Sequence, residues 1–168
     1  MEFQFKCATC DEVHVGMPSF AVNEPLHFWS VPAAERASRC ELASDFARID
    51  EHFFVRGCIE LPVDGTDDVF TWGVWVSLSA ASAAQFVASY DTAERSHIGP
   101  FFGWLNSSLS PYPETLNLKT HVHLRNNGIR PFIQLEPTDH PLAVEQHEGI
   151  TMTRVGELYS HMMAKLPG

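Results

Sequence analysis

Two neighbouring segments with alternating apolar and polar residues constrain the fold most strongly. Residues 53–63, FFVRGCIELPV, place apolar side chains on one side of an extended strand and polar ones on the other. Residues 69–78 alternate in the same way after DGTDD, a composition typical of turns. The pair therefore predicts an antiparallel hairpin. Its buried side is expected to contain Phe53, Val55, Ile59, Leu61, Val63, Phe70, Trp72, Val74, Val76 and Leu78.

A helix and a second hairpin are predicted next along the chain. The segment SAASAAQFVASYD carries a stripe at helical spacing, with Ser79 as the expected N-cap. Residues 117–125 alternate, and NNG then turns the chain into IRPFIQL, which predicts a second hairpin. The expected helix stripe consists of Ala83, Phe86, Val87 and Tyr90.

The remaining segments predict a loop and two helices. Residues 99–115 mix aromatic residues with Gly, Pro and Ser, which indicates a short apolar segment followed by a long ordered loop. Residues 138–149 predict a short helix that starts near Thr138 or Asp139 and ends before Gly149. Thr151 precedes a last helix with Val155, Leu158, Tyr159 and Met162 in its stripe.

Hairpins separated by helices predict an α+β fold in one domain, residues 1–168. We expect a mainly antiparallel sheet with three or so helices packed against it and an N-terminal CxxC knuckle. Neither GxGxxG nor GxxxxGK[ST] is present, which disfavours a nucleotide-binding fold.

Charge and composition narrow the choice of partners. The formal net charge of −10 repels phosphate backbones and anionic lipid, so we expect no nucleic-acid or membrane partner, and a basic protein is the better candidate. The opening residues MEFQFKC show no basic region followed by a long apolar run, and no apolar run approaches the roughly 20 residues that span a bilayer, so we expect a cytoplasmic protein. Oligomeric state cannot be inferred from the sequence.

The opening stretch FKCATCDEVH is the first candidate site. Cys7 and Cys10 can present two sulfurs to one tetrahedral ion, and His14 adds an imidazole nitrogen. A closed zinc site needs a fourth ligand, for which Cys40 is the candidate. The alternatives are a reduced pair without metal and redox catalysis, which would normally place CxxC at a helix N-terminus.

A second candidate site is the polar face of residues 117–125. Lys119, His121, His123 and Arg125 share one side of the expected strand. The cations Lys119 and Arg125 beside the two imidazoles would oppose a bound metal ion, so an anion or an acidic group fits this face better. The alternative is an ordinary exposed polar sheet face.

Two functional classes fit these features. The first is a binding or interaction module that docks a partner through its exposed face; an immunity protein against a basic toxin is one version. The second is an enzyme for a small anionic substrate, with its site between the His121/His123 face and the 99–115 loop. The sequence contains no complete catalytic motif such as GxSxG or HExxH, so it leaves open whether the protein is an enzyme.

The chain also resembles an uncharacterised bacterial family, domain of unknown function 2199. The shared segments include FKCATCDEVH, SDFARIDEHFFVRGCIELPV, FTWGVWVSLS, GPFFGWL, YPETLNLKT and LEPTDHPLAVEQHEGIT. The resemblance implies an architecture without a known reaction. The family pattern is similar to CxxCGxxH with a later Cys after SD. This chain has Asp11 and Ala47 at those positions, so a four-ligand site would require Cys40.

Overall fold

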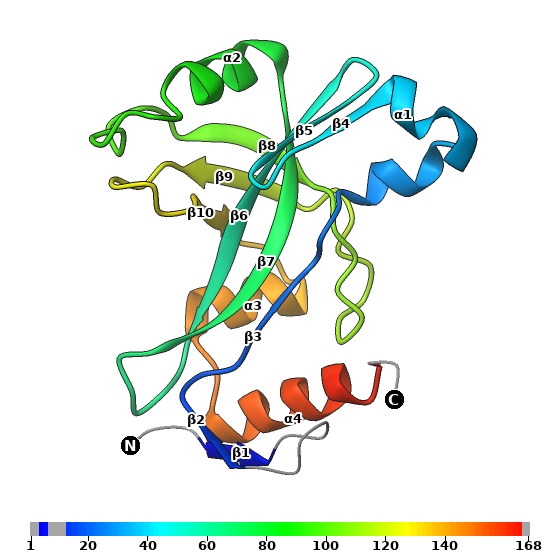
Figure 1. Ribbon diagram of the computed structural model, residues 1–168. Helices are drawn as coiled ribbons and strands as arrows, with labels where there is room; N and C mark the ends of the chain where they lie inside the picture. Colours follow the sequence, from blue (N-terminus) through cyan, green and yellow to red (C-terminus); the bar gives the residue numbers. More distant parts are fainter. Residues whose placement is uncertain (1–3, 7–12, 166–168) are drawn as a thin grey trace.

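The long hairpin predicted from the sequence forms β6 (His52–Pro62) and β7 (Val69–Leu78). The computed structural model describes residues 4–6 and 13–165. β6 and β7 pair antiparallel from Phe53↔Leu78 to Pro62↔Val69. Their alternating apolar residues are buried as predicted, with Phe53 partly buried at the end of the hairpin. This hairpin is the longest part of the sheet (Figure 1).

Three further strands close the sheet into a five-stranded barrel. β8 (Phe101–Leu105) pairs with β7, β9 (Lys119–His123) with β8, and β10 (Phe132–Leu135) with β9, all antiparallel. β10 then returns to β6 in a parallel pairing, Phe132↔Cys58. The Cys58 backbone N–H donates to the carbonyl of Pro131 at 2.9 Å. The barrel order is therefore β6, β7, β8, β9 and β10.

Gly57 permits the barrel to close. A Cβ atom at this position would lie 2.5 Å from Cδ1 of Ile133 and 2.9 Å from the carbonyl oxygen of Pro131. Real Cβ atoms do not tolerate such distances, so any larger residue would push β10 away from β6. The close approach of these two strands depends on the missing side chain.

Other strands extend the sheet beyond the barrel. β3 (Ser19–Ala21) lies parallel to β7, β5 (Phe46–Ile49) pairs antiparallel with β6, and β4 (Cys40–Leu42) pairs antiparallel with β5. β1 (Gln4–Lys6) and β2 (Val13–Val15) form a separate antiparallel pair. Figure 1 shows this pair beside α4, at the opposite end of the molecule from β4.

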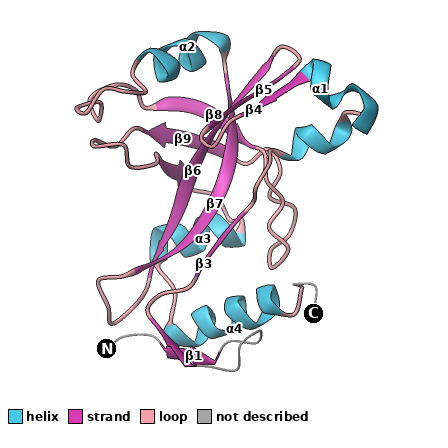
Figure 2. Ribbon diagram, in the orientation of Figure 1, coloured by secondary structure: helices cyan, strands magenta, loops and turns pink. Residues whose placement is uncertain are grey.

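Among the described residues the helices are α1 (Arg36–Arg39), α2 (Ala80–Ala88), α3 (Pro141–Glu148) and α4 (Met152–Met163), with 3₁₀ turns at Leu26–Ser30 and Ala33–Glu35. In Figure 2, α1 and α2 lie at one end of the molecule and α4 at the other, with α3 between the barrel and α4. Ser79 and Thr151 cap α2 and α4 as predicted, because each side chain accepts a hydrogen bond from a backbone N–H in the first turn. His140, directly after the predicted Thr138 or Asp139, caps α3.

Two apolar clusters hold these elements together. The larger one fills the barrel and extends to α2, α3 and α4. The smaller one packs Val31, Ala47, Ile49, Phe54 and Trp75 outside the barrel, where it supports α1 and β4. α3 is also tied to the sheet by the Gln146 amide, which accepts from the Leu135 N–H at 2.7 Å and donates to the Ile133 carbonyl at 2.8 Å.

The predicted α+β class and the two hairpins are confirmed, and one part of the helix prediction is wrong. Ala83 and Phe86 of the α2 stripe are buried, but Val87 is 54% exposed and Tyr90 is 46% exposed. Both side chains instead border a cavity that Phe46 of β5 also lines. Closure of the sheet and the fourth helix, α1, were not predicted. The CxxC knuckle lies outside the described residues.

Candidate functional site

The structure places the predicted polar face on the outside of the barrel. Lys119, His121 and His123 share the outer side of β9, and Arg125 follows two residues later. His121 Nε2 lies 3.3 Å from a carboxylate oxygen of Glu136, and Arg125 donates to Glu60 at 2.8 Å. Acidic side chains thus lie beside two of the four residues of this face, His121 and Arg125.

The remaining contacts of this face are local. His123 hydrogen-bonds Gln134 at 2.8 Å, and the Lys119 ammonium lies 6.0 Å from the ring centroid of Trp104. These side chains contact their neighbours on the sheet surface, and the three cavities described for this structure do not include His121 or His123. The anion-binding face and the enzyme hypothesis built on it stay predictions.

The loop named in the enzyme hypothesis packs elsewhere. Tyr112 donates to Glu145 of α3 at 2.6 Å and accepts from the Trp72 indole at 3.3 Å. Burial and the Glu145 carboxylate raise the pKa of Tyr112. Arg154 of α4 completes the network with a 2.6 Å ion pair to Glu145. The loop is therefore fixed to α3 and α4.

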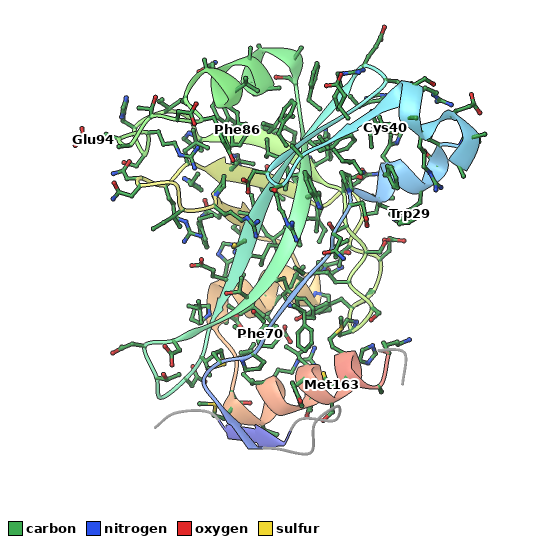
Figure 3. The ribbon with its side chains drawn as sticks, in the orientation of Figure 1. Trp29, Cys40, Phe70, Phe86, Glu94 and Met163 are labelled. Atoms are coloured by element: carbon green, nitrogen blue, oxygen red, sulfur yellow. The ribbon has the colours of Figure 1, made fainter. Side chains whose placement is uncertain are left out.

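The proposed zinc ligands are only partly described. Cys7 and Cys10 lie outside the described residues, and His14 lies in β2. Cys40 is in β4, partly buried against the smaller apolar cluster (Figure 3). Where side chains are described, no group of three His, Cys, Asp or Glu is arranged to hold a metal ion. The zinc site stays a prediction.

A site that the sequence did not reveal lies at the end of α2. A cavity of about 370 Å³ opens between Phe86 and Tyr90, the following segment 91–95, Asp45 before β5, and the loop 127–131. We call it the arginine pocket, because Arg95 and Arg130 both line it. Figure 3 shows Phe86 below α2, at the opposite end of the sheet from Phe70.

Arg95 is the central residue of the arginine pocket. Its side chain is 3% exposed, and two of its nitrogens are used: Nε donates to the Arg125 carbonyl at 2.8 Å and Nη2 to the Ile129 carbonyl at 3.0 Å. Nη1 is buried and has no hydrogen-bond partner among the described residues. Its guanidinium also lies 6.0 Å from the Phe86 ring centroid. Arg95 is thus a buried cation that no carboxylate of the described residues pairs.

Asp45 supplies the pocket's paired carboxylate. Tyr90 donates to one of its oxygens at 2.7 Å and Arg130 to the other at 2.9 Å. Burial alone would raise the pKa of Asp45, but these hydrogen bonds outweigh burial and lower it. Arg56 adds positive charge behind Asp45, and its Nε is also buried without a partner. Burial and the nearby Arg130 lower the pKa of Arg56.

A second cavity adjoins the arginine pocket. It measures about 330 Å³ and shares Asp45, Phe86, Tyr90 and Asp91 with the first cavity. Its additional lining is apolar, with Phe46 and the exposed Val87. We call this space the apolar annex.

Sequence reasoning missed the arginine pocket because nothing local identifies it. Arg95 lies in the polar segment TAERSHIG, where an arginine is normally exposed. It becomes buried only because the 125–130 loop, thirty residues later in the chain, folds over it. The one local sign was the α2 stripe, whose Val87 and Tyr90 the protein leaves uncovered.

These features define an α+β protein with a closed five-stranded barrel and an arginine-lined pocket at one end. The chain belongs to a bacterial family described as "Uncharacterized protein conserved in bacteria (DUF2199)", which matches residues 6–150. No curated protein and no solved structure shows a significant match. Through the part of the chain that the structure describes, no helix is long and apolar enough to cross a membrane.

Proposed function

We propose that this protein is a binding module that holds a small anionic molecule in the arginine pocket. The observation that carries the proposal is the buried Nη1 of Arg95, for which the described part of the chain offers no hydrogen-bond partner. A buried polar group without a hydrogen bond costs about 1–3 kcal/mol, and more when it is charged. An anion at this nitrogen would recover that energy, so the free protein is poised to bind one.

The structural role of Arg95 does not account for the whole side chain. Two nitrogens fix the 125–130 loop through its carbonyls, and carbonyl oxygens carry no full charge. By contrast, Arg125, Arg130 and Arg154 each pair with a carboxylate. A cavity lined by a buried guanidinium that no described carboxylate pairs is the arrangement expected of a ligand site.

This proposal keeps the class of protein that the sequence suggested, a binding module. The proposed binding site is now the arginine pocket and not the exposed face of residues 117–125. The basic protein partner inferred from the net charge remains a separate proposal, and the arginine pocket neither requires nor excludes it. A zinc knuckle at Cys7 and Cys10 would be structural in either case.

Arg95→Lys tests the proposal. It keeps the charge but removes the planar fork, so we expect the affinity for a small carboxylate to fall by about tenfold or more in isothermal titration calorimetry. Arg36→Gln is the matched control: Arg36 also donates to a backbone carbonyl, that of Val31, but lies outside the pocket. Its affinity should equal that of the wild type.

Ala93→Glu provides a test that leaves the Arg95 contacts in place. Ala93 is exposed and lines the arginine pocket, so a glutamate there adds a carboxylate to the lining. Binding should be lost while the unfolding midpoint stays the same or rises. If carboxylate, phosphate and sulfate all fail to bind the wild type at millimolar concentration, the proposed function is wrong.

A further inference from the structure

We infer that the ligand is a small monocarboxylic acid with an apolar body: its carboxylate lies at Arg95 and its hydrocarbon part fills the apolar annex. This inference rests on the proposed function and specifies the ligand class for the same site. Three features of the pocket support it: the number of unpaired charges, the shape of the donor, and the exposed apolar wall.

The charges favour a ligand with a single negative charge. Arg95 is the one buried guanidinium in the lining without a carboxylate, and Arg130 is already paired with Asp45. Asp45 and Asp91 line both cavities, so a second negative charge on the ligand would face two carboxylates. Like charges within one cavity repel each other strongly where water is partly excluded. A phosphate dianion is therefore disfavoured.

The geometry of Arg95 favours a carboxylate group. Nε and Nη2 are held by loop carbonyls, which fixes the plane of the guanidinium before any ligand arrives. Nη1 is buried and has no hydrogen-bond partner among the described residues, so a carboxylate oxygen that displaces part of the lining to reach it would accept its unused hydrogen bond. A preorganised donor loses little conformational entropy when it binds.

The apolar annex explains why Val87 of α2 and Tyr90, just after this helix, are exposed. Val87 and Tyr90 continue the buried stripe of the helix, yet they are about half exposed and border the annex. Phe46 stacks on Phe86 with ring centroids 6.2 Å apart and forms the floor. A hydrocarbon chain or ring on Val87 and Tyr90 would cover the surface that the barrel leaves open.

A series of ligands tests the ligand class by isothermal titration calorimetry at pH 7. The probes are acetate, butanoate, hexanoate, hexanol and inorganic phosphate. Affinity should rise along the carboxylates by up to about fourfold per buried methylene. Hexanol, which lacks the charge, and phosphate should both bind at least tenfold more weakly than hexanoate.

Two variants separate the contribution of the apolar annex to ligand affinity from that of the carboxylates in the lining. Val87→Ser changes an exposed residue of the annex and should reduce the gain from acetate to hexanoate without changing acetate binding. Asp45→Asn removes one of the carboxylates that oppose a dianion, so it should raise the affinity for phosphate relative to hexanoate. Arg36→Gln should change neither ratio.

The outcomes distinguish this inference from the proposed function. If phosphate binds in an Arg95-dependent way and hexanoate does not, the ligand class is wrong and the proposed function stands. Hexanol binding as tightly as hexanoate would also overturn the ligand class, because the charge would then contribute nothing. If no probe binds, both claims fail.

Discussion

Arg95 shows how one side chain can serve the fold and a ligand at once. Arg95 lines the arginine pocket; two of its nitrogens fix the loop that follows β9, and the third is buried with no partner among the described residues. Buried polar atoms in native proteins nearly always find partners, so an exception needs an explanation. Here the explanation is a ligand that supplies the missing oxygen.

His27 gives a prediction at the same scale. Its pKa is lowered from 6.5 by burial and then by His52, 5.0 Å away between ring centroids; Asp50 opposes this effect and Arg39 adds to it. As the pH falls below 6.5, the unfolded chain binds a proton that the folded chain does not, so the free energy of unfolding should decrease. This loss of unfolding free energy should stop once the pH has fallen below the lowered pKa of His27.

His27→Phe keeps an aromatic ring against Phe54 and removes the titrating group. Chemical denaturation between pH 5 and 8 should show a smaller loss of stability toward acid than in the wild type. An unchanged pH dependence would show that His27 titrates equally in the folded and unfolded chains. The pKa of Asp50 is also lowered, so Asp50 changes the free energy of unfolding in a separate pH range, below its ordinary pKa of 3.8.

At the scale of elements, the loop between β8 and β9 is fixed by one buried network. Tyr112 is its centre, because its hydroxyl joins Trp72 of β7 to Glu145 of α3. The sequence predicted this segment as a long ordered loop and could not indicate which elements it joins. Arg154 packs its guanidinium 5.6 Å from the Tyr112 ring centroid and brings α4 into the same network.

Tyr112→Phe should lower the free energy of unfolding by about 1–3 kcal/mol, because it leaves the Trp72 indole and one Glu145 oxygen without this partner. Urea denaturation measures the change. Ser108→Ala is the control on the same loop: its hydroxyl makes only an exposed hydrogen bond to Glu114, so we expect about 0.5 kcal/mol or less. Equal effects would mean that the buried network contributes no more than a surface contact.

The elements that sequence patterns predicted are those whose side chains alternate locally. Both hairpins and the caps Ser79 and Thr151 were predicted because each depends on residues close in the chain. The parallel pairing of Phe132 with Cys58 joins segments more than seventy residues apart and has no local signature. The burial of Arg95 and the exposure of Val87 follow from that closed arrangement, so they could not be predicted.

At the scale of the whole molecule, closure of the barrel places the arginine pocket. The Asn127–Pro131 part of the lining is the turn that leads into β10, and β10 reaches β6 only because Gly57 has no side chain. Fold and site therefore depend on a single close contact between two strands.

Gly57→Ala tests that dependence. The added methyl would meet Ile133 and the Pro131 carbonyl, so the free energy of unfolding should fall by about 1–3 kcal/mol. Gly156→Ala is the matched control, because nothing lies within 4 Å of its added Cβ and it is inside α4. A stabilisation of about 0.5–1 kcal/mol is expected there. A neutral Gly57→Ala would show that β10 and β6 do not approach so closely.

The most direct test of the account is a crystal structure of the protein with 6-bromohexanoate, because the anomalous signal of bromine locates the apolar end independently of the carboxylate. The account predicts a carboxylate oxygen about 2.7–2.9 Å from Arg95 Nη1. The bromine should lie in the apolar annex beside Val87 and Tyr90. An empty arginine pocket at saturating ligand, or a carboxylate bound away from Arg95, would contradict the account.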